Sequence, residues 1–593
     1  MSDHSEAMGP PGDMVYRKPA VLSFEIIQHT GIFFEEQLYT QALNLLFSTL
    51  ASGTYASEAV IAPLPQHIAL AGTFLVHPST TTRAKTAEQK EAAHVALRLL
   101  RLISTLITPQ DARLDLAFCF KHTQTSRSGR LLYANEDSSP DLPHDKTDWQ
   151  RLGVANESSL WSRAEDFWHA VGWAFNCSVL HSERWEHWQI WLRFMCDILL
   201  DDWNVRVQEY EEFQEKKQKD GQEPTTPEQP KGKGARSKKN DGLDIFRESM
   251  LFRYIHGNRH GQNRRIIRAI FADGSTASVN EFRQVFPKEL KHSKSKARPE
   301  KAKKRDREVN FEQEEYGDYL SQDESDEEGN ETTDPSMSNS RSSSPPAGSK
   351  SRRTKRTRRG TRSAADPTAA EPLRDSADAV QTTLTHHGGG VSTMGGLESL
   401  GLRKRLLGLL SRVSERIPSD FIHFSELYYL FVENIRPLPL PIFQTFVSPY
   451  VLPELPDEQQ TTLCQALLLF MLESSAPNMH DEDLNQDNME NCFLPFAAST
   501  ASIVDNVKVS IILEASIILL ANSNMLTLTP SFKEAIENGI LRRAERAQDD
   551  MRRSAASRNM ESLEWCWLVE SGERLMFLVE LLASRPSQQA SQG

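Results

Sequence analysis

Four residues of types that can bind a metal lie in one tryptophan-rich segment of the chain. Cys177, His181, His187 and Cys196 are all side chains that coordinate zinc. They form no CxxC or HxxxH pair, however, and their spacing matches no structural zinc pattern. The segment therefore favours satisfied core or rim residues over a metal site, and the sequence predicts no cofactor.

Motifs that carry catalytic chemistry are missing from the sequence. It contains no GxxxxGK[ST] phosphate loop, no GxGxxG, no HExxH and no GxSxG. The acidic "DED" at 481–483 is predicted to lie in a loop, where paired carboxylates usually form a solvated surface. "LLGLL" at 406–410 satisfies the LxxLL pattern, but core helices produce that pattern often. A non-enzymatic protein is favoured. An enzyme with a cryptic site in the N-terminal domain stays an alternative, because catalytic groups can converge from distant positions.

Two dense basic clusters flank an acidic run in the middle of the chain. Such clusters are read by import receptors or bound by nucleic acid, and we expect nuclear import. The alternative is a solvated linker without a function of its own. Three phosphorylation patterns accompany them, in which Thr226 and Ser344 precede proline and Ser325 precedes "DEE". Phosphorylation there would add negative charge beside the basic clusters. The predicted import residues are Lys301, Lys303, Lys304, Arg305, Arg307, Arg352, Arg353, Lys355, Arg356, Arg358, Arg359 and Arg362.

A third group of basic residues lies in a short ordered island at 243–274. The pattern there predicts a helix, a glycine turn "GNRHGQN" and an arginine-rich helix. We predict that Arg259, Arg264, Arg265 and Arg268 add a weak, sequence-independent nucleic-acid contact. The alternative is that the apolar sides dock on the N-terminal domain while the arginines face water.

Seven of the ten tryptophans lie between Trp161 and Trp203, and their spacing is helical. They are Trp161, Trp168, Trp173, Trp185, Trp188, Trp191 and Trp203. We expect two helices with a turn at "NCSVLHSER" and the rings in the core, although the projection turns Trp173 away from the main stripe. Burial of each ring contributes at most roughly 4–6 kcal/mol. An aromatic cage for a cation would need rings open to solvent, and the charges throughout the segment argue against a membrane element.

The elements that would position these residues are helices separated by polar segments. Hydrophobic residues make up 38% of the 593-residue chain, the net charge is −13, and the six cysteines include no CxxC pair, which fits a reducing compartment. The predicted organisation is a disordered N-terminus at 1–22, a helical domain at 23–214, a linker at 215–242, the helical island at 243–287, a disordered basic and acidic linker at 288–393, a C-terminal helical domain at 394–584 and a disordered tail at 585–593.

The fold class that follows is all-α. We expect two helical domains, either bundles or irregular helical repeats, joined by a long mixed-charge linker. The most apolar run, at 509–523, contains Glu514 and is too short to cross a bilayer, so no membrane contact is expected. The sequence favours a nuclear scaffold or adaptor that binds other proteins in a chromosome-associated assembly for chromatin organisation or DNA repair. An assembly factor in RNA processing or ribosome biogenesis is the alternative.

Overall fold

The computed structural model of the chain confirms the all-α fold. It describes residues 16–53, 59–120, 158–220, 242–256, 261–290, 394–477, 484–551 and 558–584. These described residues all belong to one compact unit. Among them only Pro19–Ala20 (β1) and Val60–Ile61 (β2) pair as strands, in a parallel bridge two residues long.

The N-terminal region begins with helices that pack around α4. A reciprocal cap fixes the start of α4, because Thr86 accepts a bond from the Gln89 N–H while the Gln89 side chain accepts one from the Lys85 N–H. The helices are α1 Phe24–Glu35, α2 Tyr39–Ser52, α3 Pro65–Phe74, η2 Pro78–Thr80, α4 Ala87–Leu106, α5 Leu114–Ala117, α6 Leu160–Arg163, α7 Phe167–Leu180 and α8 Ser182–Asp220.

The predicted tryptophan hairpin is present as α7 and α8, except that Trp161 lies in the separate short helix α6. All seven rings are at most 8% exposed. The turn is shorter than predicted. Helix α7 continues through Asn176 and Cys177, and His181 alone separates it from α8. Trp173, which projects away from the main stripe, is also buried, because its indole N–H meets the carboxylate of Glu289.

The island folds into four short helices that pack on α7 and α8. Phe282, just after them, lies on Gly172 of α7 so closely that a Cβ there would come within 2.3 Å of the ring. Helix α11 also contacts α14 (Gly396–Arg416) and α15 (Phe424–Ile435), so the island touches both helical regions. The helices are α9 Asp244–Arg247, α10 Met250–Ile255, α11 Gln262–Ile270 and α12 Thr276–Glu281.

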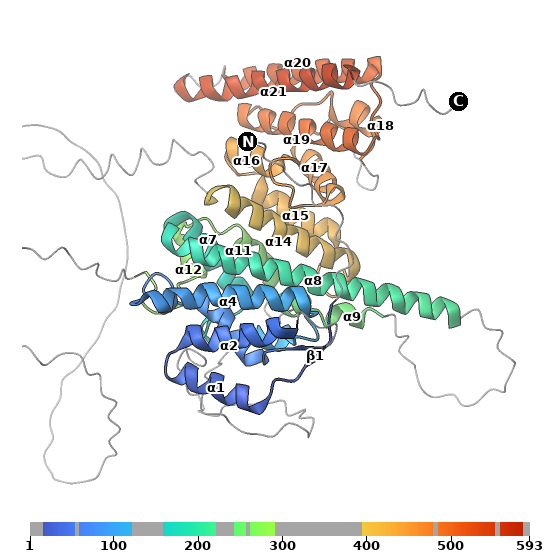
Figure 1. Ribbon diagram of the computed structural model, residues 1–593. Helices are drawn as coiled ribbons and strands as arrows, with labels where there is room; N and C mark the ends of the chain where they lie inside the picture. Colours follow the sequence, from blue (N-terminus) through green and yellow to red (C-terminus); the bar gives the residue numbers. More distant parts are fainter. Residues whose placement is uncertain are drawn as a thin grey trace, which may run out of the picture. The chain divides into compact units, whose positions relative to one another are not determined.

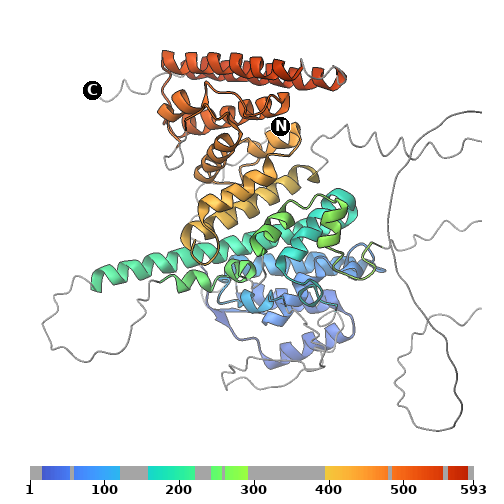
Figure 2. The same cartoon turned by 180° about the vertical axis from the view of Figure 1, so that it is seen from behind.

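The C-terminal region continues the stack as successive layers (Figures 1 and 2). Helix α14 packs on α8, α15 on α17, α17 on α19, and α19 on α21. The elements are α14 Gly396–Arg416, α15 Phe424–Ile435, α16 Leu440–Val447, α17 Asp457–Met471, α18 Gln486–Asn488, the π-helix η5 Met489–Phe493, α19 Ile503–Asn522, α20 Pro530–Met551 and α21 Arg558–Ser584. No helix within the described ranges is long and apolar enough to cross a membrane.

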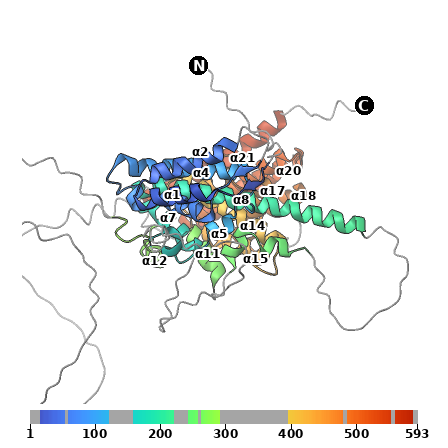
Figure 3. The ribbon, with the colours of Figure 1, turned by 60° about the horizontal axis from the view of Figure 1, so that its bottom comes forward.

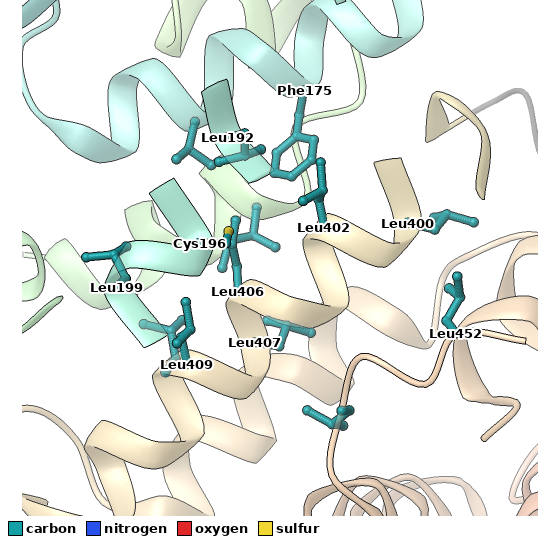
Figure 4. Packing of buried hydrophobic residues seen from close by; sticks show 14 of the residues in the cluster. Phe175, Leu192, Cys196, Leu199, Leu400, Leu402, Leu406, Leu407, Leu409 and Leu452 are labelled. Carbon is teal, nitrogen blue, oxygen red and sulfur yellow. The ribbon is translucent and has the colours of Figure 1, made fainter. Parts of the chain in front are cut away.

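Helix α14 has two buried faces and joins the two regions (Figure 4). Leu402, Leu406 and Leu409 lie toward α7 and α8, and Leu400 and Leu407 lie on the side of Leu452. The predicted apolar stripe of this segment therefore contacts the N-terminal region, while a second row packs within the C-terminal region.

Arg403 of α14 makes polar contacts with the N-terminal region. Its guanidinium is fully buried and donates to the carbonyls of Ile270 and Ala272, at the C-terminal end of α11, and it lies 4.1 Å from the centre of the Phe175 ring. Cations are favoured at this end of a helix because the last carbonyls are otherwise unpaired. Burial lowers the pKa of Arg403 to about 9.

Several predicted boundaries shift in the structure. Tyr16–Leu22 is described and holds β1, and α8 runs to Asp220, past the predicted start of a linker at 215 (Figures 1 and 3). At the other linker, Lys288–Leu290 is described and Glu289 is 1% exposed. The remainder of the predicted 288–393 linker, from 291 to 393, lies outside the described residues, as do the N-terminal residues 1–15 and the tail 585–593.

Candidate interaction groove

An apolar hollow lies between α19, α20 and α21. Its volume is about 420 Å³. An apolar groove with a few polar groups is the usual form of a binding site. Its lining residues are Ser510, Ile540, Arg543, Ala544, Trp565, Leu568, Val569, Gly572, Glu573, Met576, Phe577 and Glu580.

Helical spacing and one glycine set the geometry of this groove. Leu568, Leu575 and Val579 form the buried face of α21, at most 6% exposed, and turn the opposite face of the helix outward. Gly539 lets α20 approach the chain after η5, because a Cβ there would lie 1.8 Å from the Leu494 carbonyl oxygen. A larger residue at 539 would therefore clash with this carbonyl unless α20 moved.

Arg543 lies among the lining residues with its guanidinium buried. One nitrogen, Nη1, donates to the carbonyls of Leu494 and Phe496 at 3.1 and 3.2 Å. Its Nε and Nη2 atoms are buried and have no hydrogen-bond partner among the described residues. Burial lowers the pKa of this side chain to about 9. The groove therefore contains an arginine whose hydrogen-bonding capacity is only partly used.

The outer face of α21 combines apolar and acidic side chains. Val569 and Phe577 are 48% and 60% exposed, and Glu573 lies between them on the same face. Glu580 is also exposed, one turn further on. The described residues that line the groove include no histidine, cysteine or aspartate. The arrangement is suited to holding an apolar segment with basic flanks.

A second hollow, of about 620 Å³, lies in the N-terminal region and is lined mainly by charged residues. Asp202 is buried there, accepts a bond from the Met250 N–H at 2.8 Å, and has its pKa raised by burial. Arg253 pairs with Asp115 at 2.8 Å, and Arg206 pairs with Glu248 at 3.1 Å. These carboxylates are matched by arginines, so the hollow is an ion-pair network in which no nucleophile lies beside a base among the described lining residues.

A buried charge cluster that the sequence did not reveal holds the N-terminal region together. The Glu289 carboxylate accepts bonds from Arg184 at 2.8 Å and from the indole N–H groups of Trp188 and Trp173 at 2.8 and 3.1 Å. Arg184 also donates to Thr81 and to the Val76 carbonyl. A lone glutamate after "FPK", at the start of a polar segment, carries no periodicity that would place it in a core.

The predicted nucleic-acid arginines of the island face carboxylates of the same chain. Arg265 pairs with Asp166 at 2.6 Å, and Arg268 holds both oxygens of Glu281 at 2.8 and 2.7 Å. Arg264 lies 3.8 Å from Glu433 of α15. Arg259 is outside the described residues. The docking of the island on α7 and α8 matches the alternative weighed in the sequence, and the nucleic-acid contact stays a prediction.

The other predicted residues fall into two groups. The import clusters at 301–307 and 352–362 and the phosphorylation sites Thr226, Ser325 and Ser344 lie outside the described residues. Within the described ranges, no three histidine, cysteine, aspartate or glutamate side chains are grouped to hold a metal. Cys177 and Cys196 are buried free thiols.

Comparison with known proteins adds no further assignment. No protein-family model matches the chain, and no curated protein matches it.

Proposed function

We propose that the protein is a nuclear, non-enzymatic scaffold or adaptor in a chromosome-associated assembly, serving chromatin organisation or DNA repair. Its helical regions bind other proteins, and its basic clusters engage an import receptor. The observation that carries the scaffold assignment is the apolar groove of the terminal helix pair. It combines exposed aromatic and aliphatic side chains on a helix that is otherwise well packed.

The occupant that best fits the groove is an amphipathic helix of a partner protein with basic residues beside its apolar face. The groove lies between two helices, which suits a third helix. Glu573 and Glu580 are exposed and have no ion pair among the described residues, so they would attract lysine or arginine.

A second copy of the chain fits less well. A twofold contact centred between Val569 and Phe577 would place Glu573 against Glu573 of the copy. Like charges in a closing interface are unfavourable. The exposed face therefore selects a different protein rather than itself.

The test is a comparison of full-length variants in nuclear extract. Val569→Glu and Phe577→Glu place charge in the groove and should abolish recovery of the partner. Ile32→Glu is the matched control, since Ile32 is 53% exposed on α1 and far from the groove in the stack. A synthetic helix from the recovered partner should bind the wild-type chain at least ~10-fold more tightly than the Glu573→Lys/Glu580→Lys variant.

Two results would contradict this assignment. Equal partner recovery with Val569→Glu and Ile32→Glu would remove the groove from the function. A wild-type dimer in sedimentation that Val569→Glu dissociates would make a second copy the occupant.

The cellular process is tested by purification with and without DNase or RNase. Co-purifying chromosome proteins support the proposed process, whereas pre-ribosomal or RNA-processing particles would support the alternative assembly factor. Catalytic turnover that is lost on changing a polar residue beside the tryptophan hairpin would instead support the enzyme alternative.

Nuclear import has its own test. Changing Arg352, Arg353, Lys355, Arg356, Arg358 and Arg359 to alanine should raise the cytoplasmic share of a fluorescent fusion. Unchanged localisation after both basic clusters are neutralised would refute import through these residues.

A further inference from the structure

One exposed face of α4 carries basic residues at every turn. Lys90, His94, Arg98 and Arg101 are all exposed. At 100° per residue their side chains fall within about 80° of the helix circumference and extend over about 16 Å of its length. The buried face of α4 points the other way, so this face is open along the whole row.

Lys90, Arg98 and Arg101 differ from the arginines of the island in having no carboxylate at ion-pair distance among the described residues. Arg98 instead lies over the Phe47 ring of α2, 4.8 Å from its centre, which holds the guanidinium at the surface. Arg264, Arg265 and Arg268 are each close to an acidic side chain of the same chain. An unpaired cation adds more to the free energy of binding an anion than a cation that must first break an ion pair.

The neighbouring helix adds uncharged donors. Helix α2, which packs along α4, contains no acidic residue and exposes Gln41, Asn44 and Ser48. Amide and hydroxyl side chains of this kind contact phosphate oxygens together with lysine and arginine. Acidic residues lie near the N-terminal end of the row. Glu88 and Glu91 are exposed on α4, and Glu183 and Glu186 of α8 line the same hollow as Lys90 and His94.

A hollow of about 290 Å³ lies at the N-terminal end of the row, between α4 and α8. Lys90, His94, His187 and Thr82 line it. The pKa of His187 is lowered to about 4, first by burial and then by the charges of Arg184, His94 and Lys90. Glu183 and Glu186 of α8 line the same hollow, so this end of the row carries both signs of charge.

We propose that this α4 face binds the phosphate backbone of a nucleic acid without regard to sequence. The row offers cations and uncharged donors on a convex helix, and it holds no arrangement that would read base edges. The inference is carried by α4 and its neighbours, so it does not depend on the groove or on the island arginines.

The test is a salt titration of binding to a labelled duplex, with DNA and RNA as separate arms. The full chain is used with the linker clusters at 301–307 and 352–362 changed to alanine, so that the folded part supplies the remaining cations. Lys90→Ala/Arg98→Ala/Arg101→Ala should flatten the slope of log affinity against log salt by about 2.7 for DNA, from roughly 0.9 per phosphate contact.

A matched control removes three exposed cations elsewhere. Lys216→Ala/Lys217→Ala/Lys219→Ala acts at the far end of α8 and should leave the slope unchanged. Arg264→Ala/Arg268→Ala measures the contribution of the island arginines separately, since those arginines already face carboxylates. Thermal melting by circular dichroism should show the same folded state for all variants, since the α4 residues are exposed.

Three outcomes would overturn the proposal. The first is the absence of duplex binding once the linker clusters are neutralised. The second is an equal loss of slope in the α4 and α8 variants. The third is competition by polyglutamate as strong as that by duplex, which would assign the face to an acidic protein instead.

Discussion

The two helical regions each bury an arginine, but they satisfy it differently. Arg184 in the N-terminal region contacts the Glu289 carboxylate, which two indole N–H groups also bind. Arg543 in the C-terminal region donates to two backbone carbonyls, and two of its nitrogens have no partner among the described residues. A charge buried with a matched partner is fixed in place, whereas an unmatched one raises the free energy of the folded state.

This difference separates a closed core from an open surface. Around Glu289 the acceptors and donors are matched, and the side chains come from α7, α8 and the segments at 76–82 and 286–289. Around Arg543 the walls are apolar and Val569 and Phe577 remain exposed. The N-terminal cluster therefore serves stability, and the C-terminal groove is where we propose that a partner binds.

The largest expected effect comes from removing the carboxylate of the closed cluster. Glu289→Ala should lower the free energy of unfolding by about 3–5 kcal/mol, because Arg184 would remain buried without its partner. Denaturation with urea, followed by tryptophan fluorescence, measures the change. Glu281→Ala is the control, since its pair with Arg268 is partly exposed and should cost under about 1 kcal/mol. An equal loss of unfolding free energy in Glu289→Ala and Glu281→Ala would mean that burying the Arg184–Glu289 pair adds nothing to stability.

The tryptophans test the same cluster one side chain at a time. Trp188→Ala and Trp191→Ala should each cost about 3–5 kcal/mol, the usual range for a large buried ring. Substitution by phenylalanine should separate them. Trp188 donates to Glu289 at 2.8 Å, whereas the buried Trp191 N–H has no partner among the described residues. Trp188→Phe should therefore cost about 1–3 kcal/mol more than Trp191→Phe in the same urea experiment. The opposite order would show that the bond to Glu289 does not stabilise the fold.

Acid should weaken the N-terminal core through a buried histidine. Burial lowers the pKa of His67 from 6.5 to about 4, so the unfolded chain binds more protons than the folded chain between these values. His67 therefore contributes about 3 kcal/mol to the free energy of unfolding above pH 6.5, and this contribution is lost as the pH falls toward 4. Thermal unfolding across this range should show a shallower pH dependence for His67→Leu than for the wild type. Identical profiles would place the acid sensitivity in other groups.

The smallest effect is expected at the arginine of the groove. Arg543→Met should cost only about 1 kcal/mol, because the lost bonds to Leu494 and Phe496 are offset by removing a buried, partly unpaired charge. Arg184→Met is the matched substitution and should cost about 3–5 kcal/mol, since it leaves Glu289 unpaired. Urea denaturation of both variants measures the two changes in the free energy of unfolding. A loss of 3 kcal/mol or more for Arg543→Met would mean that the two buried arginines stabilise their regions alike.

The sequence by itself determined which segments are helical and which faces they bury. Helical periodicity placed the tryptophans in the core, and "RPLPLP" marked the end of α15 at Ile435, because these signals act over a few residues. The groove was not visible in this way, since α21 carries apolar residues on both its buried and its exposed faces. Periodicity does not tell which of two apolar faces finds a partner.

Only the tertiary structure decided the polar contacts between distant segments. Glu289 meets Arg184 across 105 positions of the sequence, and Arg403 meets the end of α11 across more than 130. The same holds for the cations, because Arg265 and Arg268 are paired by residues that packing brings to them while the α4 row is left unpaired. The sequence shows which side chains are charged. Whether a charge is paired depends on which side chains the fold places within a few ångströms of it.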